Sequence, residues 1–235
     1  MCKGKQKIQT PSLSPNFCSA LPALIFWDWN GTLLDDRDYA IGVRNRVFPR
    51  FGLPCVQNLE EYYSQFTFPI RVYYERAGVT EENFVAVANA WMEEYVRGAE
   101  TIPLHTDAYT ALRAFQEAGL SQVVLSASDK KILTNQLAQY QLTDFFAEVL
   151  GLDHIYATSK QSIGEAYLKA SGTEPAACVL LGDSLHDAEV AKEIGTQCIL
   201  ISRGHQSRET LKTAGVPVCA NLMDAVRLLS EPHRR

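Results

Sequence analysis

Short apolar runs that alternate with helix-like segments constrain the fold of this chain most. The strand-like runs in its second half cover residues 122–125, 148–152, 177–181, 197–201 and 216–219. The helix-like segments around them cover residues 106–118, 130–140, 161–170, 185–194, 208–214 and 222–229. Strands separated by helices of this length predict a parallel, doubly wound sheet with right-handed crossovers. The expected fold class is therefore α/β, with a Rossmann-like core.

One more apolar run, Ala23–Trp27, stands near the start of the chain and ends abruptly at Asp28. A short apolar run that a glycine soon follows, here Gly31, indicates a fully buried strand leading into a loop. Ligands of open α/β sheets bind at the carboxyl ends of the strands, which is where Asp28 falls. A carboxylate buried there is unfavourable unless it is paired or holds a metal, although a plain turn cap is the simpler alternative.

The stretch between this strand and the alternating region is expected to be entirely helical. Helices are predicted over residues 36–51, 58–66 and 70–77, and a longer one is expected to start at a Thr80 cap and run through Tyr95. This pattern predicts a helical cap domain at 36–104, inserted into a core formed by residues 21–35 and 105–235. Residues 1–20 lack the apolar segment of a secretory signal and are expected to be a flexible leader.

Composition excludes several classes of partner. The formal net charge of −5 argues against a nucleic-acid surface or an anionic membrane as the main partner. No apolar run approaches the ~20 residues needed to span a bilayer. The cysteines form no C-x-x-C pair, and Cys178, Cys198 and Cys219 lie in strand-like runs, where buried reduced thiols are expected. The predicted location is the cytoplasm.

The residues Asp28-Trp29-Asn30-Gly31-Thr32-Leu33 resemble the first motif of the haloacid dehalogenase superfamily, usually written Asp-x-Asp-Gly-Thr-Leu. The resemblance implies that Asp28 is the nucleophile, which becomes transiently phosphorylated. The second Asp of that motif protonates the leaving group and then activates water. Here Asn30 occupies its position, and its backbone carbonyl can still bind the metal as that position does in the family.

Two further stretches resemble the phosphate-binding motifs of the superfamily. Ser126, after an apolar strand, resembles the second motif, in which the hydroxyl and the following backbone amide, that of Ala127 here, hold a phosphoryl oxygen. Taken alone, Ser126 could equally be an ordinary turn residue. Lys160 resembles the lysine of the third motif, which neutralises the phosphate and holds the nucleophile. The usual proline after it is missing, so Lys169 is the alternative.

The fourth motif is the most specific, and it reads Gly182-Asp183-Ser184-Leu185-His186-Asp187. Asp183 and Asp187 are four residues apart, so one helical turn can place both on the same face. With Asp28 on a neighbouring strand they make an all-oxygen site suited to Mg²⁺, completed by the Asn30 carbonyl. The alternative is that Asp183 caps the helix and Asp187 only complements its dipole.

The chemistry expected from these residues is phosphoryl transfer to Asp28, which needs mainly positioning and charge neutralisation. Asn30 cannot exchange a proton, and general acid–base catalysis is typically worth ~10²–10⁴-fold. Weak or narrow phosphatase activity is therefore expected. His186 could act as a substitute proton donor, although a solvated histidine is the ordinary alternative.

The resemblance leaves several reactions to weigh. A 2-haloacid dehalogenase dispenses with the metal site, and a phosphomutase needs an acid where Asn30 stands. A phosphonoacetaldehyde hydrolase needs a cap lysine, but no lysine lies between Lys7 and Lys130. The prediction is a Mg²⁺-dependent phosphatase of the phosphoglycolate phosphatase branch, monomeric or homodimeric, acting on a small phosphorylated metabolite. Candidates to meet an anionic substrate are Arg44, Arg46 and Arg71. The alternative is a non-catalytic relative that binds a phosphometabolite or a protein partner.

Overall fold

The computed structural model describes residues 21–152 and 159–230, so the expected leader at 1–20 lies outside the described residues. A parallel sheet of six strands forms its centre, in the order β3-β2-β1-β4-β5-β6. The strands are β1 (Leu24–Trp27), β2 (Ser121–Asp129), β3 (Glu148–Leu152), β4 (Cys178–Gly182), β5 (Gln197–Ile201) and β6 (Val218–Cys219). This confirms the α/β fold class. The first strand in sequence, β1, lies in the interior of the sheet between β2 and β4.

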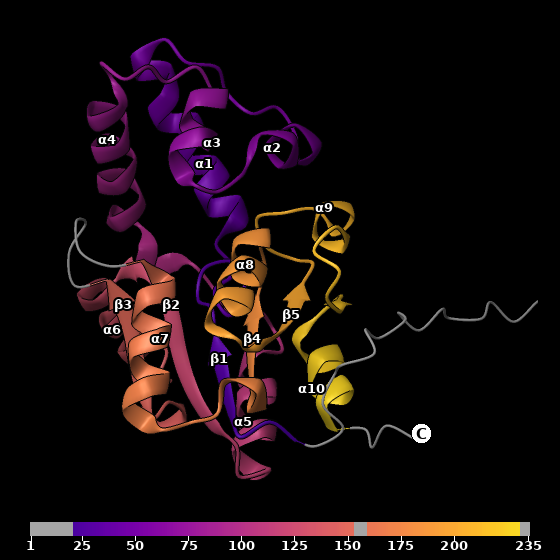
Figure 1. The fold of residues 1–235 in the computed structure, drawn as a ribbon. Coiled ribbons are helices and arrows are strands. Elements are labelled where there is room, and N and C mark those ends of the chain that lie inside the picture. Colours follow the sequence, from indigo (N-terminus) through magenta and orange to yellow (C-terminus); the bar gives the residue numbers. More distant parts are fainter. Residues whose placement is uncertain (1–20, 153–158, 231–235) are drawn as a thin grey trace, which may run out of the picture.

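Helices cover both faces of the sheet (Figure 1). They are α5 (Ala108–Glu117), α6 (Lys130–Gln139), α7 (Lys160–Ser171), α8 (Leu185–Ile194), α9 (Arg208–Lys212) and α10 (Leu222–Ser230). Successive side chains of a strand point to opposite faces. Accordingly, Ile25 and Trp27 of β1 share a buried cluster with α5, α6 and α10, whereas Leu24 and Phe26 share another with α7, α8 and α9.

A second group of helices lies together beyond the carboxyl ends of the strands (Figure 1). It consists of α1 (Arg37–Val47), α2 (Leu59–Gln65), α3 (Ile70–Arg76) and α4 (Phe84–Arg97), with short 3-10 turns at Phe48–Phe51 and Ala99–Thr101. We call residues 37–101 the helical unit. Gly52, with φ of 73°, ends its first helical stretch in the left-handed conformation that glycine favours. The Asn58 side chain caps α2 by accepting from the Glu61 amide.

Several element boundaries differ from the prediction by a few residues, and two of these differences have a visible cause. The longest helix of the helical unit begins at Phe84 and not after Thr80. The Thr80 amide donates to Asn83 Oδ1 instead (2.8 Å), which turns the chain before the helix begins. In addition, β2 does not end at Leu125 but continues through Ser126 to Asp129, with a shift of register against β3 after Leu125.

Two expectations drawn from composition can be compared with the fold. Cys178, Cys198 and Cys219 are buried free thiols, as predicted. Among the described residues, no helix is long and apolar enough to cross a membrane.

Candidate active site

Asp28 follows directly on β1 and is fixed by its surroundings. Its backbone amide donates to the Leu181 carbonyl of β4 (2.9 Å). The tryptophans on either side of it, Trp27 and Trp29, are fully buried. Their indole N–H groups donate to Gln122 Oε1 and Gln136 Oε1, both at 2.9 Å. Because buried indoles are satisfied in this way, the backbone that carries Asp28 has little freedom to shift.

Lys160 joins two of the predicted carboxylates. Its Nζ lies 2.6 Å from Asp28 Oδ1 and 2.5 Å from Asp187 Oδ1, and all three side chains are buried. Burial disfavours the Lys160 cation, but Asp187 and Asp28 outweigh it and raise the pKa of Lys160. For Asp28 burial is the larger effect and raises its pKa to about 6 against the opposing Lys160 charge. Lys169, the alternative, is exposed at the far end of α7.

Asp187 is locked at the start of α8. Ser184, and not Asp183, is the capping residue: its hydroxyl accepts from the Asp187 amide. In return, Asp187 Oδ2 accepts from the Ser184 amide (3.0 Å), the Ser184 hydroxyl (2.6 Å) and the Asp183 amide (3.2 Å). This capping box leaves Asp183 out of the helix cap, contrary to the alternative considered from the sequence.

Asp183 lies where two backbone segments pass very close to it. A Cβ placed on Gly204 would lie 1.9 Å from Asp183 Oδ2, and one on Gly31 would lie 2.3 Å from the same atom. Gly31 also has φ of 73°, so both space and conformation require glycine there. The His205 amide donates to Asp183 Oδ2 (2.5 Å). Burial raises the pKa of Asp183 to about 8, with His205 opposing the shift and Asp28 and Asp187 adding to it.

The donor set fits a divalent cation. Asp28, Asp183 and Asp187 each offer a carboxylate oxygen, and these atoms lie within 4.8 Å of one another. Lys160 is the one lysine or arginine in contact with them among the described residues, and its charge does not offset the burial and mutual repulsion that raise the pKa of Asp28 and Asp183. Buried carboxylates that repel one another are stabilised by a hard cation, and oxygen ligands are those that Mg²⁺ prefers.

The predicted phosphate-binding residues lie at the edge of the same site. Ser126 is buried, and its hydroxyl accepts from the Ser128 amide (3.1 Å). Ala127 is exposed. Both line one cavity together with Asp28, Lys160 and Asp183. Their place on the extension of β2, next to β1, brings them beside Asp28.

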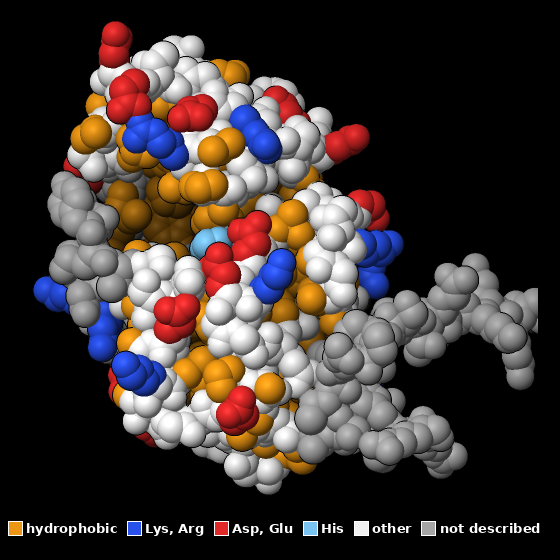
Figure 2. Space-filling model, in the orientation of Figure 1, with side chains coloured by type: hydrophobic (Ala, Val, Ile, Leu, Met, Phe, Trp, Pro, Cys, Tyr) orange, Lys and Arg blue, Asp and Glu red, His pale blue; other side chains and the backbone are white. Residues whose placement is uncertain are grey.

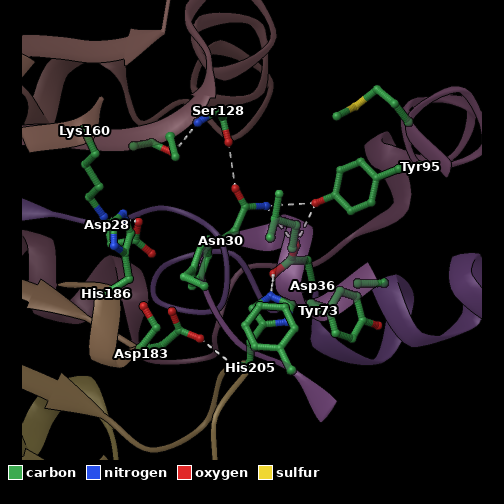
Figure 3. Close-up of a pocket in the computed structure, with 18 of the residues that line it drawn as sticks. Asp28, Asn30, Asp36, Tyr73, Tyr95, Ser128, Lys160, Asp183, His186 and His205 are labelled. Atoms are coloured by element: carbon green, nitrogen blue, oxygen red, sulfur yellow. Dashed lines mark hydrogen bonds and ion pairs between the residues drawn. The ribbon is translucent and has the colours of Figure 1, made fainter. Parts of the chain in front are cut away.

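The Asn30 side chain is fully engaged (Figure 3). Its Nδ2 donates to Asp36 Oδ2 (2.8 Å) and to the Tyr95 hydroxyl (2.9 Å), while its Oδ1 accepts from the Ser128 hydroxyl (2.8 Å). Tyr95 in turn donates to Asp36 Oδ2 (2.7 Å). The amide is therefore held by Ser128 of β2, by Asp36 just before α1 and by Tyr95 of α4, and an amide cannot protonate a leaving group.

Asp36 and His205 form a buried ion pair next to Asn30. His205 Nε2 donates to Asp36 Oδ1 (3.1 Å), and its Nδ1 lies 2.7 Å from the Tyr62 hydroxyl. Burial opposes a charge on His205, but the Asp36 carboxylate prevails and raises its pKa to about 9. Burial also works against ionisation of Asp36, yet His205, Tyr95 and Asn30 lower its pKa.

Sequence reasoning missed Asp36, Tyr95 and His205. One signal was available for His205: it follows β5 in the run Ser202-Arg203-Gly204-His205, at the carboxyl edge of the sheet. No sequence signal pointed to Tyr95, because in an amphipathic helix a tyrosine of a site has the same pattern as a tyrosine of the core.

A cavity of about 400 Å³ opens between these residues and the helical unit. Figure 2 shows it as a hollow whose visible wall carries mostly hydrophobic side chains, with a histidine at its rim. His186 lines it, with its ring stacked on Phe68 at 4.9 Å. The three arginines of the helical unit that were candidates from the sequence do not line it. Arg44 is buried against Tyr73 and Gln65, Arg46 pairs with Glu94, and Arg71 pairs with Glu75 and Glu81.

Comparison with known proteins gives consistent matches. The family model of haloacid dehalogenase-like hydrolases matches residues 25–201. The chain is 23% identical over 220 residues to phosphoglycolate phosphatase 1 of Pseudomonas aeruginosa, covering 89% of this chain and 80% of that protein. It is also 23% identical to a phosphoglycolate phosphatase of Synechococcus elongatus, covering 83% of this chain and 90% of that protein.

Solved structures agree at the level of the fold. A haloacid dehalogenase-like hydrolase from Streptococcus pneumoniae matches with a TM-score of 0.78 at 16% identity, over 90% of this chain and 99% of that one. A predicted phosphoglycolate phosphatase from Haemophilus somnus matches with a TM-score of 0.74 at 16% identity, over 90% and 98%. These matches confirm the resemblance that the four motifs indicated, and the enzyme class expected from it.

Proposed function

The chain belongs to the haloacid dehalogenase-like hydrolase family, and on that premise we propose that it is a Mg²⁺-dependent phosphatase of a small phosphorylated metabolite, working through an aspartyl-phosphate on Asp28. The observation that carries the proposal is the convergence of four segments on one carboxylate. Lys160 from α7 contacts Asp28 after β1 and Asp187 in α8, and Ser126 of β2 lines the same cavity. A lysine between two buried carboxylates supplies the positive charge that favours an ionised nucleophile next to a phosphate group.

The roles follow from the placement of each group. Asp28, Asp183 and the Asn30 backbone carbonyl would hold Mg²⁺, with Asp187 supporting the site through Lys160 and Ser184. The bound cation would neutralise charge on the transferred phosphoryl group. The Ser126 hydroxyl, the Ala127 amide and the Lys160 ammonium would bind phosphoryl oxygens. The helical unit would act as the cap domain that closes over the substrate.

The reaction then has two steps on Asp28. A carboxylate oxygen of Asp28 attacks phosphorus, the bond from phosphorus to the leaving oxygen breaks, and the electron pair leaves with that oxygen. Water next attacks the phosphorus of phospho-Asp28, releasing phosphate and restoring the carboxylate. Since Asn30 cannot protonate the leaving oxygen, the first step lacks a contribution worth ~10²–10⁴-fold with poor leaving groups.

Metal binding is tested by calorimetry on four proteins. Wild type should bind Mg²⁺ with a millimolar or lower Kd, and Asp183→Asn should abolish the binding. Gly204→Ala should abolish it too, because the added methyl takes the space of Asp183 Oδ2. Gly42→Ala, on α1, meets only the flexible end of Arg46 and should bind normally. Equal binding by Asp183→Asn and wild type would contradict the assignment.

Phosphoryl binding is tested with beryllium fluoride, which mimics a phosphoryl group on a carboxylate. With Mg²⁺ present it should stabilise the wild type but not Asp28→Ala. A ligand at one hundred times its Kd adds about 2.7 kcal/mol to the free energy of unfolding. No thermal shift, together with no turnover of any phosphate ester, would favour the alternative of a non-catalytic binding protein. Asn30 is the observation behind this alternative, because its amide cannot act as the general acid.

A further inference from the structure

We propose that the substrate is an aryl phosphate, the phosphate ester of an apolar, phenol-like hydroxyl group, and not a small phosphorylated acid. The inference deepens the proposed phosphatase function and rests on it. It combines the lining of the cavity with the hydrogen bonds of Asn30.

Some of the large apolar side chains that are exposed on the described residues belong to the cavity. Ile70, Met92 and Val96 are 42%, 49% and 45% exposed, and all three line it. They come from α3 and α4 of the helical unit. Apolar surface gathered in a concave site next to polar groups is typical of a ligand-binding wall. The part of the ligand that lies against them is therefore apolar.

Aromatic rings extend this wall down to the phosphate end of the cavity. Phe66 stacks on His205 with ring centroids 5.0 Å apart and 24° between the planes. Phe68 stacks on His186 at 4.9 Å and 23°. One ring face of each histidine is thus covered by a ring of the helical unit, and all four rings belong to the lining of the cavity. Flat surfaces of this kind fit an aromatic ring.

Positive charge in the cavity is already in use. Among the described residues, Lys160 is the one lysine or arginine that lines it, and it is paired with Asp28 and Asp187. His205 is paired with Asp36. A second anionic group on the substrate, such as a carboxylate, would lie against apolar side chains with no free cation to pair with it. Burial of an unpaired charge is strongly unfavourable.

Asn30 adds an independent requirement on the leaving group. Its amide is held by Asp36, Tyr95 and Ser128 and donates no proton, so the leaving oxygen departs as an anion and takes its proton from solvent. A phenolate, with a conjugate acid pKa of about 10, departs far more readily than an alkoxide. Aryl phosphates meet both requirements in one molecule: an apolar ring and a leaving oxygen of low basicity.

The experiment compares kcat/KM for four esters with Mg²⁺ present: phenyl, 1-naphthyl and 4-carboxyphenyl phosphate, and 2-phosphoglycolate. The second ring of 1-naphthyl phosphate should improve kcat/KM over phenyl phosphate by roughly tenfold or more. The carboxylate of 4-carboxyphenyl phosphate should reduce it, although this phenolate is the better leaving group. The 2-phosphoglycolate value should be the lowest.

A matched pair of variants on α4 tests the wall itself. Val96→Lys places a cation in the cavity and should raise kcat/KM for 4-carboxyphenyl phosphate relative to phenyl phosphate. Val85→Lys, at a site that is 66% exposed and does not line the cavity, should leave that ratio unchanged. If 2-phosphoglycolate is the best substrate, or if the carboxylate on the ring has no effect, this inference is wrong and the phosphatase function stands. If no ester turns over and beryllium fluoride gives no shift, the proposed function fails as well.

Discussion

Asn30 shows how much of this site depends on single side chains. Four hydrogen bonds of 2.7–2.9 Å fix Asn30 and Asp36 to each other, to Tyr95 of α4 and to Ser128 of β2. An amide suits this position because it can donate to Asp36 and accept from Ser128 at once. A carboxylate at residue 30 would face the Asp36 carboxylate and would be stable there only while it kept its proton.

This reasoning predicts the effect of Asn30→Asp. A carboxyl group that Asp36 keeps protonated can serve as the missing acid, so turnover of alkyl phosphates should rise toward the upper part of the ~10²–10⁴ range. Bond cleavage in aryl phosphates should change little, because phenolates leave without protonation. Single-turnover experiments separate this step from hydrolysis of the phospho-Asp28 intermediate.

The control for that experiment is Asn135→Asp, the same chemical change on the exposed face of α6. If wild type already hydrolyses alkyl phosphates as fast as Asn30→Asp, then another residue supplies the proton. His186→Asn would be the next variant to measure, since His186 lines the cavity.

At this scale the sequence predicted the four charged residues that the structure brings together around Asp28, but not the pair of Asp36 and His205 beside them. Asp28, Lys160, Asp183 and Asp187 stand at strand ends or helix starts, where position alone points to a ligand. Asp36 and His205 are 169 residues apart and give no local pattern. The arginines of the helical unit were assigned by charge alone, and buried or surface partners hold all three.

At the scale of the elements, apolar runs predicted the strands well because each strand of a parallel sheet is buried on both faces. Helix starts were predictable where a side chain caps them, as Asn58 and Ser184 do. The start of α4 was misplaced because Asn83, and not Thr80, organises the preceding turn. The extension of β2 past Ser126 depends on its pairing with β3, which no local pattern reports.

Contacts between elements lead to a prediction on stability. Gln122 of β2 accepts from the Trp27 indole (2.9 Å) and donates to the Leu112 carbonyl at α5 (3.0 Å). Gln122→Leu leaves the indole N–H and this carbonyl without their partner, so the free energy of unfolding should fall by roughly 1–3 kcal/mol. Equilibrium unfolding in urea measures this change in the free energy of unfolding.

The matched control is Gln116→Leu on α5, where the glutamine side chain donates to the Asp144 carbonyl at the surface. That change should stay within about 0.5 kcal/mol of wild type. If the free energy of unfolding falls by a similar amount in both variants, the buried hydrogen bonds of Gln122 make no specific contribution to stability.

At the scale of the whole molecule, the loop after β5 connects Asp183 with the helical unit and with Asp107. The Arg203 guanidinium pairs with Asp107, while the Arg203 and Gly204 carbonyls accept from Arg37 and Tyr63 of the helical unit. The next residue, His205, supports Asp183. The sequence predicted a helical insertion next to the catalytic strand, but this loop brings together residues more than a hundred positions apart, so it could not be foreseen.

Asp107 anchors that loop, which gives a prediction on pH. It pairs with Arg203 and accepts from the Leu222 and Met223 amides at the start of α10. Burial works against ionisation of Asp107, but Arg203 outweighs it and lowers the pKa below the ordinary 3.8. Its contribution to stability is therefore complete above pH ~4 and is lost as the pH falls through the lowered pKa.

Asp107→Ala should accordingly lower the free energy of unfolding by roughly 1–2 kcal/mol at pH 7. The gap between variant and wild type should narrow as the pH is lowered below about 4. Asp144→Ala, at an exposed site, is the control and should show no such dependence. A gap that widens toward acid would contradict the sign assigned here.

The interior position of β1 also affects the order in which the protein can form. The ribosome makes this strand before both of its neighbours, which begin only at Ser121 and Cys178. At a synthesis rate of about 5–20 residues per second, roughly 10–30 s pass before β4 is made and can pair with the second edge of β1. Lys160 is made only near the end of that interval, and Asp183 and Asp187 follow after β4. Catalytic competence is therefore a late event in synthesis, and we expect the apolar edge of a newly made β1 to be a point where folding can fail by self-association.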